Sequence, residues 1–474
     1  MLFSSLTFLF AFLPLILIAY YLCPKAGRNY VLLTFSLLFY FWGGPSYLLV
    51  LICSIIVNFL IVRQLNKKDN LKKFYFRLGI VCNLVLLVFY KYLDFFILNI
   101  NSLCLSANGS FQKIPYFEIV LPLGISFFTF QQMSMLFDVY KKEGIQTTCF
   151  SKTALYISFF PQLIAGPIVR YGDIIDQINA RKENLILFKS GIQKFILGLF
   201  KKVIIANNCG IIADAIMLAD VGEISTPVAW LGVIAYTFQI YFDFSGYSDM
   251  AIGLGRMFGF RIIENFNFPY LSKSIKEFWR RWHISLSTWF RDYVYIPLGG
   301  NRKSKIRTYI NLFLVFVLTG FWHGATWSFI FWGVFHGFFL IVERLGFDKT
   351  LKQSPGIFSW IYSMLVVMIG WVFFKIEEFG NAVAYVVRMF GGGINVDSSI
   401  MEYLNNESIF ILGLAILASS PFFLKVKEYC IQLDSQALKT SVALGKEFIL
   451  LCMFFLSVLY INSGSYNPFI YFRF

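Results

Sequence analysis

The chain has 474 residues, of which 58% are hydrophobic, 20% are aromatic and only 14% are charged. Its mean hydropathy of +0.67 lies outside the range of soluble globular proteins, so the composition indicates an integral membrane protein. The formal net charge of +15 does not indicate nucleic-acid binding, because the cytoplasmic loops of membrane proteins are themselves rich in Lys and Arg.

Apolar runs long enough to cross a bilayer recur along the whole chain, and no soluble domain fits between them. No small-residue cleavage site follows the first run, so we expect a retained helix rather than a signal peptide. The sequence predicts an all-α polytopic membrane protein with roughly 10–12 transmembrane or re-entrant helices in a single membrane domain, residues 1–474. The apolar runs include residues 5–22, 46–62, 78–100, 119–140, 228–250, 357–375, 408–424 and 447–463.

Basic clusters predict how the chain is oriented, because such clusters favour the cytoplasmic side. This assignment places both termini outside the cytoplasm. Segment 154–170 lies between two cytoplasmic clusters and is interrupted by Pro161, Gly166 and Pro167. We therefore expect a broken, re-entrant segment whose backbone is buried in protein. The basic clusters are residues 63–77, 141–152, 181–202, 273–307 and 425–446.

Segment 308–343 is apolar but is flanked by basic residues on both sides. Its two halves, about 309–322 and 325–342, meet near His323, and the first half is short for a full membrane span. These features predict a helical hairpin or re-entrant pair with His323 near its inner turn.

Two of the three histidines of the chain, His323 and His336, lie in this apolar segment. An ionisable side chain at membrane depth is costly and is a candidate functional residue, although a hydrogen-bonded core histidine is the alternative for His323. On one continuous helix, His336 would lie about 20 Å along and roughly 220° round from His323. We therefore interpret His336 as structural, in a site separate from that of His323.

The longest polar stretch, residues 257–308, alternates aromatic and basic side chains and is predicted to be cytoplasmic. An amphipathic interfacial helix explains most of its residues. His283 is the exception, because a ring beside so much positive charge is biased toward its neutral form.

Asp243 and Asp249 stand in an otherwise apolar segment and could act as an acid/base pair or hold an ion. Capping of helix ends, or pairing with basic residues such as Arg256 and Arg280, is the favoured interpretation. The eight cysteines show no CxxC motif and no Cys/His pairing, so we expect no metal site and no disulfide scaffold.

Several long motifs closely resemble the membrane-bound O-acyltransferase family, and in particular its bacterial alginate O-acetyltransferase branch. The resemblance covers essentially the whole chain. It is carried by "MLFSSLTFLFAFLPL", "SFFPQLIAGPIVRY", "YFDFSGYSDMAIGLGRMFGFRIIENFNFPYLSKSIKEFWRRWHISLSTWFRDYVYIPLGGNRKS", "GFWHGATWSFIFWGVFHG" and "NPFIYFRF".

The resemblance implies a ring-like helical membrane domain with a funnel from each side meeting at a catalytic histidine. The family's essential W-H-G histidine falls on His323, and the histidine of its R-W-H-x-S-L-S motif falls on His283. Both are expected to be catalytic. Guanidinium and ammonium groups suit phosphate, so the expected contacts to the phosphates of an acyl-coenzyme A are Lys276, Arg280, Arg281 and Arg302.

The same resemblance implies that acetyl-CoA on the cytoplasmic side is the donor substrate, with no permanently bound cofactor. The acetyl group would pass through the bacterial cytoplasmic membrane to an extracytoplasmic SGNH-type partner. That partner would modify a polysaccharide such as alginate, cellulose or peptidoglycan. The absence of a G-D-S nucleophile motif in this chain is consistent with this division of labour.

Two alternatives remain open from the sequence. The first is transfer of D-alanine to teichoic acid from a carrier-protein thioester, as in a related branch of the family. The second is a transporter or flippase in which Asp243, Asp249 and His323 relay an ion. The paired "WRRWHISLS" and "WHG" motifs favour an enzyme over a transporter.

Overall fold

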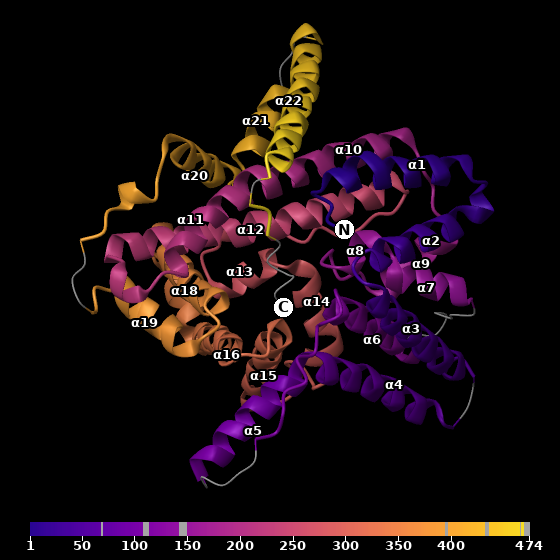
Figure 1. Cartoon of the computed structure of the whole chain (residues 1–474), viewed down its shortest axis with the longest axis horizontal. Helices are drawn as coiled ribbons and strands as arrows, with labels where there is room; N and C mark the ends of the chain where they lie inside the picture. The colour runs from indigo at the N-terminus through magenta and orange to yellow at the C-terminus, as the bar shows by residue number, and fades with distance from the viewer. Residues whose placement is uncertain are drawn as a thin grey trace. The chain divides into compact units, whose positions relative to one another are not determined.

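The computed structural model describes the chain except for residues 68–69, 108–112, 142–148, 394–396, 432–435, 465 and 469–474. The described residues form helices α1 to α22 and contain no β-strand. The chain divides into two compact units, which are described separately here (Figure 1). The last six residues of the "NPFIYFRF" motif lie outside the described residues.

The first unit consists mainly of residues 7–183. Its core holds a cluster of phenylalanine rings in which Phe160 lies 5.5 Å from both Phe12 and Phe39, measured between ring centroids. The helices of this unit are α1 (Leu13–Leu22), α2 (Arg28–Phe41), α3 (Pro45–Leu65), α4 (Lys72–Leu87), α5 (Leu93–Ala107), α6 (Ile125–Lys141), α7 (Phe150–Ser158), α8 (Phe160–Leu163) and α9 (Tyr171–Asn179).

Segment 154–170 is broken, as its Pro and Gly content predicts. Helix α7 ends at Ser158, the four-residue α8 ends at Leu163, and irregular backbone continues to α9. Residues 154–169 are all buried, which satisfies the requirement that non-helical backbone at membrane depth be covered by protein.

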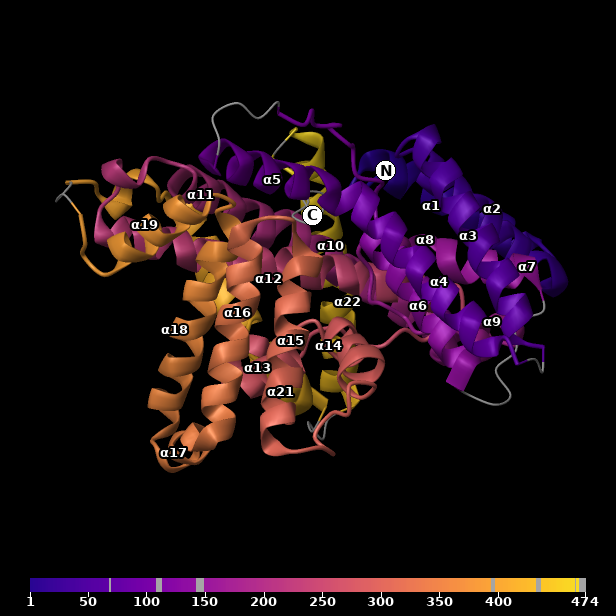
Figure 2. The same cartoon turned by 90° about the horizontal axis from the view of Figure 1, so that it is seen from below.

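The second unit consists mainly of residues 184–323 and 327–474. Figure 2 shows its helices α15, α16 and α18 side by side, and α10 packs along the long helix α12. The helices of this unit are α10 (Leu185–Phe200), α11 (Asn207–Met217), α12 (Thr226–Met257), α13 (Ile275–Arg281), α14 (Ile284–Phe290), α15 (Lys305–His323), α16 (Trp327–Val342), α17 (Asp348–Gln353), α18 (Gly356–Lys375), α19 (Phe379–Met389), α20 (Asn406–Ala418), α21 (Phe422–Ile431) and α22 (Gln436–Asn462).

Small residues let α10 and α12 approach each other closely. A Cβ atom on Gly191 would lie 2.6 Å from the Gly253 carbonyl oxygen, and one on Gly198 would lie 2.5 Å from the Gly246 carbonyl oxygen. The two glycines of α10 are seven residues apart, and so are the two glycines of α12. The two contacts therefore fix one line of close packing between the helices.

Seven helical segments among the described residues are long and apolar enough to cross a membrane, and the bent pair α20 and α21 makes an eighth. The predicted class, an all-α polytopic membrane protein, is therefore confirmed. The larger count expected from the sequence included shorter apolar segments, such as the helix over Phe8–Leu22. The seven segments are Pro45–Leu65, Lys72–Leu105, Leu185–Met217, Lys305–His323, Trp327–Gln353, Gly356–Lys375 and Lys439–Asn462.

Candidate active site

Helices α15 and α16 form the helical hairpin predicted for 308–343, and His323 is the last residue of α15. The two helices meet at glycines. A Cβ atom on Gly320 would lie only 2.3 Å from the Phe329 carbonyl oxygen, and one on Gly333 would lie 2.4 Å from the Phe316 carbonyl oxygen. Because Gly320 is one turn before His323, this contact fixes the height at which the histidine is held.

His323 is 4% exposed and is surrounded by aromatic rings. Its ring centroid lies 4.9 Å from Trp322, 5.1 Å from Trp332 and 4.9 Å from Phe374. Such a setting excludes bulk water, and electrostatic interactions inside it are correspondingly strong.

His283 precedes α14 and is fully buried, with a backbone φ of +42°. A non-glycine residue in the left-handed region costs on the order of 1–3 kcal/mol and persists only where the surroundings enforce it. Burial lowers the pKa of His283 to about 3, so its imidazole is neutral at physiological pH. The sequence predicts a neutral ring because of nearby positive charge, whereas the structure attributes it to burial.

Trp322 packs near both histidines. Its ring centroid is 4.9 Å from that of His323 and 6.4 Å from that of His283. The motifs that carry the two histidines are forty residues apart in the sequence, and the fold brings both rings to one indole.

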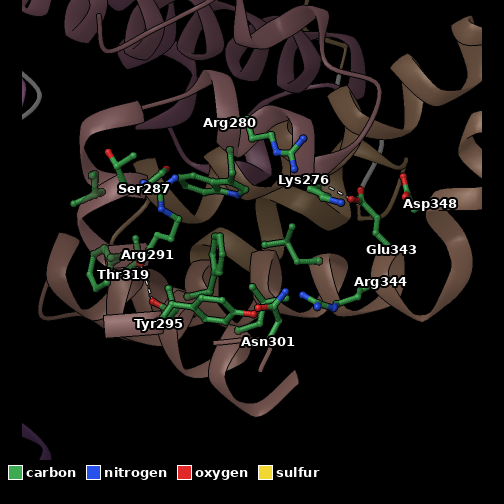
Figure 3. Close-up of a pocket in the computed structure, with 18 of the residues that line it drawn as sticks. Lys276, Arg280, Ser287, Arg291, Tyr295, Asn301, Thr319, Glu343, Arg344 and Asp348 are labelled. Atoms are coloured by element: carbon green, nitrogen blue, oxygen red, sulfur yellow. Dashed lines mark hydrogen bonds between the residues drawn. The ribbon is translucent and has the colours of Figure 1, made fainter. Parts of the chain in front are cut away.

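A cavity of about 920 Å³ lies among the same helices, within the size range of small-molecule sites, although neither histidine is among the residues that line it. Its lining includes Ile284, which follows His283, and Thr319, one turn before His323. Five basic residues and two acidic ones line it, so the wall has an excess of positive charge. All of these charged residues except Lys349 are labelled in Figure 3. The charged lining residues are Lys276, Arg280, Arg291, Arg344, Lys349, Glu343 and Asp348.

Two of the four predicted phosphate-binding residues, Lys276 and Arg280, line this cavity. Arg281 is not among the lining residues and pairs with Glu277 at 2.9 Å. Arg302 is exposed and is also absent from the lining. Helical spacing explains the split, because Lys276 and Arg280 are four residues apart on one face of α13, while Arg281 is rotated by about 100°.

Glu343 was not identified from the sequence. It is 2% exposed, and its carboxylate accepts the backbone N–H of Ile275 at 2.6 Å and of Lys276 at 3.0 Å. The Tyr362 hydroxyl also donates to it at 3.3 Å. The carboxylate therefore caps the start of α13, the helix that presents Lys276 and Arg280 to the cavity.

His336 lies closer to His323 than its spacing on one continuous helix predicts, because the chain reverses between α15 and α16. Both histidines contact Trp332, at 5.1 Å for His323 and 5.0 Å for His336. The Trp279 indole N–H donates to Nδ1 of His336 at 3.4 Å. His336 does not itself line the cavity, but it contacts Trp279, which does.

Asp243 and Asp249 pair with basic residues, but not with the arginines that the sequence suggests. Asp243 lies 2.6 Å from Lys202, and Asp249 lies 2.9 Å from Lys194 and 2.7 Å from Lys201. All three lysines come from α10 or from the π-helical segment Lys201–Ala206 that continues it, and both pack along α12. In the described part of the chain, no cluster of three or more His, Cys, Asp and Glu could hold a metal ion.

The model of the membrane-bound O-acyltransferase family matches residues 128–376 of this chain. A probable alginate O-acetylase of Azotobacter vinelandii is 39% identical, and the match covers 100% of both chains. A peptidoglycan O-acetyltransferase of Helicobacter pylori is 34% identical over 100% of this chain and 98% of the relative. A teichoic acid D-alanyltransferase of Bacillus subtilis is 33% identical, but over 52% of this chain and 64% of the relative. The resemblance found in the motifs is confirmed.

Proposed function

This chain belongs to the membrane-bound O-acyltransferase family and is a multi-pass membrane acyltransferase, and we propose that it transfers acetyl groups from acetyl-CoA to hydroxyl groups of a cell-surface or exported polysaccharide. The extent of the matches supports acetyl transfer over D-alanyl transfer. Relatives named for O-acetyl transfer align along the whole chain, whereas those named for D-alanyl transfer align with about half of it.

The single observation that carries the proposal is the basic and aromatic cavity, whose lining includes Ile284, next to His283 in the sequence, and Thr319, one turn before His323. Its basic residues suit the phosphates of coenzyme A, because guanidinium groups bind phosphate oxygens in bidentate fashion. Its aromatic lining residues, such as Trp279 and Phe316, suit the uncharged pantetheine arm that carries the thioester. Lys276, Arg280 and Arg344 are the cations proposed to meet the phosphates.

A thioester is already activated, so the reaction mainly needs a base for the attacking hydroxyl and stabilisation of the developing oxyanion. We assign the base role to His323. Its imidazole takes the hydroxyl proton as the oxygen attacks the carbonyl carbon. The carbon–sulfur bond then breaks, and the thiolate of coenzyme A recovers the proton. His283, which packs near the same Trp322 ring, is assigned a supporting role.

The route and the partner rest on the family resemblance alone. Acetyl-CoA is proposed to enter from the cytoplasm, and the acetyl group to leave on the opposite face of the bacterial cytoplasmic membrane. There an SGNH-type partner would pass it to the polysaccharide. Alginate-like polymers, cellulose and peptidoglycan are the candidate acceptors, and the first and last are the substrates in the names of full-length relatives.

The test is acetyl transfer in membranes that contain the protein and its partner, with radiolabelled acetyl-CoA as donor. We expect acetyl-CoA-dependent labelling of the glycan and release of free coenzyme A. The variant His323→Ala should abolish both while its membrane level and melting temperature stay at wild-type values. Wild-type labelling by the His323→Ala variant would refute the catalytic assignment.

The same assay separates the alternatives. Labelling from a D-alanyl carrier-protein thioester, but not from acetyl-CoA, would replace the proposal with D-alanyl transfer. A transporter would release no coenzyme A from either donor.

A further inference from the structure

Asn265 is buried between α12 and α13 and connects three parts of the active site. Its side-chain nitrogen donates to the Ser248 hydroxyl of α12 at 3.1 Å. Its side-chain oxygen accepts the backbone N–H of Ser285 at 3.0 Å and lies 3.3 Å from Nδ1 of His283. Its backbone carbonyl accepts the N–H of Ile284 at 2.9 Å. These bonds hold the left-handed backbone of His283 in place.

The network fixes which end of the Asn265 amide is the oxygen. The backbone N–H of Ser285 can only donate, so the atom facing it must accept. A flipped amide would set its NH₂ group against that N–H, with two donors facing each other. The amide oxygen therefore faces Ser285 and His283, and the nitrogen faces Ser248.

The orientation of the amide in turn fixes the proton on His283. The Asn265 oxygen can only accept, so Nδ1 of His283 must be the nitrogen that carries the hydrogen. The Ser285 hydroxyl, 3.4 Å from Nδ1, can rotate to accept as well. The neutral ring then has a lone pair on Nε2, a buried atom that makes no hydrogen bond within the described part of the chain.

We propose that Asn265 is a positioning residue that holds His283 in its Nδ1–H tautomer, so that Nε2 accepts a hydrogen bond from a substrate hydroxyl other than the one whose proton His323 takes. This inference rests on the proposed function. It also limits what His283 does: a neutral ring with a bare Nε2 orients a hydroxyl, but it cannot donate to an oxyanion, which needs a hydrogen-bond donor.

The described neighbours of the His283 ring carry no charge, so Asn265 is the group that decides which ring nitrogen carries the proton. Phe244 of α12 lies 4.5 Å from the imidazole and Trp322 of α15 lies 6.4 Å away, between ring centroids. The remaining described polar neighbours, Asn265 and Ser285, are uncharged. A charge introduced at position 265 would therefore act directly on the imidazole.

The variant Asn265→Asp uses this arrangement as a test. A carboxylate keeps both acceptor bonds but places a negative charge beside Nδ1–H, which favours the imidazolium and raises the pKa of His283 by about one to three pH units. The imidazolium has no lone pair on Nε2, so activity should be lost as the pH falls through the raised pKa. We expect the acidic limb of kcat/KM against pH to become steeper in the variant, with lower values than the wild type at acidic pH, because a second histidine then gains a proton in that range. The control is Ser248→Ala, which removes only the hydroxyl that accepts from the Asn265 amide nitrogen. It should leave the acidic limb of the kcat/KM profile unchanged.

A spectroscopic measurement keeps the inference testable if Asn265→Asp does not fold. The chain contains three histidines, so ¹⁵N-histidine labelling gives few signals, and comparison with the His283→Gln variant assigns those of His283. We expect a protonated Nδ1 and an unprotonated Nε2 in the wild-type protein. A protonated Nε2, or an Asn265→Asp profile that superimposes on that of the wild type, would overturn the inference. Absence of acetyl transfer by the wild type would instead refute the proposed function.

Discussion

The glycine contact between α15 and α16 gives a direct test of how the hairpin positions His323, the proposed base. In Gly320→Ala, the new Cβ would lie 2.3 Å from the Phe329 carbonyl oxygen and 3.1 Å from Cα of Gly333. A carbon and a carbonyl oxygen in contact are normally at least about 3.3 Å apart. The two helices must therefore separate by about 1 Å, since the facing atoms are backbone and cannot rotate away.

The cost has two measurable parts. Overpacking of this kind destabilises a protein by about 1–3 kcal/mol. His323 is on the same helix only three residues after Gly320, and a displacement of about 1 Å at a catalytic group can reduce the rate by about 100-fold. We therefore expect kcat to fall by about two orders of magnitude in a protein that is only moderately less stable.

The assay compares acetyl-transfer rates and thermal unfolding of purified variants. The matched control is Gly413→Ala on α20, where a new Cβ would meet nothing within 4 Å and where alanine favours the helix. Gly333→Ala should reproduce the defect, because its Cβ would lie 2.4 Å from the Phe316 carbonyl oxygen. If Gly320→Ala matched Gly413→Ala in both rate and melting temperature, the contact would not position His323.

Two further predictions address the charged residues. Arg280→Ala should raise the KM for acetyl-CoA by about tenfold with little change in kcat, because a charge-assisted hydrogen bond is worth about 1.5–3 kcal/mol. The KM for acetyl-pantetheine, which lacks the nucleotide phosphates, should not change. An equal rise in KM for both donors would contradict the phosphate role. Lys202→Met should lower the melting temperature sharply, because an unpaired buried Asp243 costs about 3–5 kcal/mol. The double variant Lys202→Met, Asp243→Leu should recover much of that loss, and a double variant no more stable than the single one would refute the pairing argument.

Hydropathy and charge could predict the membrane class and the hairpin, because both depend on local composition. They could not predict what an apolar helix faces. The run 119–140 reads as a span, yet α6 begins at Ile125 and almost all of its residues are buried in protein, including Thr129, Gln131 and Gln132. An apolar sequence is equally suited to lipid and to a protein core, so periodicity alone does not separate the two.

Which basic residue pairs with which carboxylate depends on how far one helix is shifted along its neighbour. The local sequence does not predict this shift. Asp249 meets Lys194 and Lys201 because glycine contacts set α10 against α12 at one height. Arg256, the partner expected from proximity in sequence, pairs with Glu264 at 3.1 Å instead. By contrast, the separation of Arg280 from Arg281 follows from helical spacing once the cavity face of α13 is known.

The reversal at His323 changes how the third histidine is understood. On one continuous helix, His336 would lie far from His323. In the hairpin, His336 contacts the same Trp332 ring as His323. Its Nδ1 accepts from Trp279, and its Nε2 faces Gly370, where an added Cβ would come within 2.8 Å. The bond and the tight fit fix His336 from two sides, so it holds the indole that lines the cavity. A structural histidine thereby links the wall of the proposed donor site to the ring packed against the proposed base.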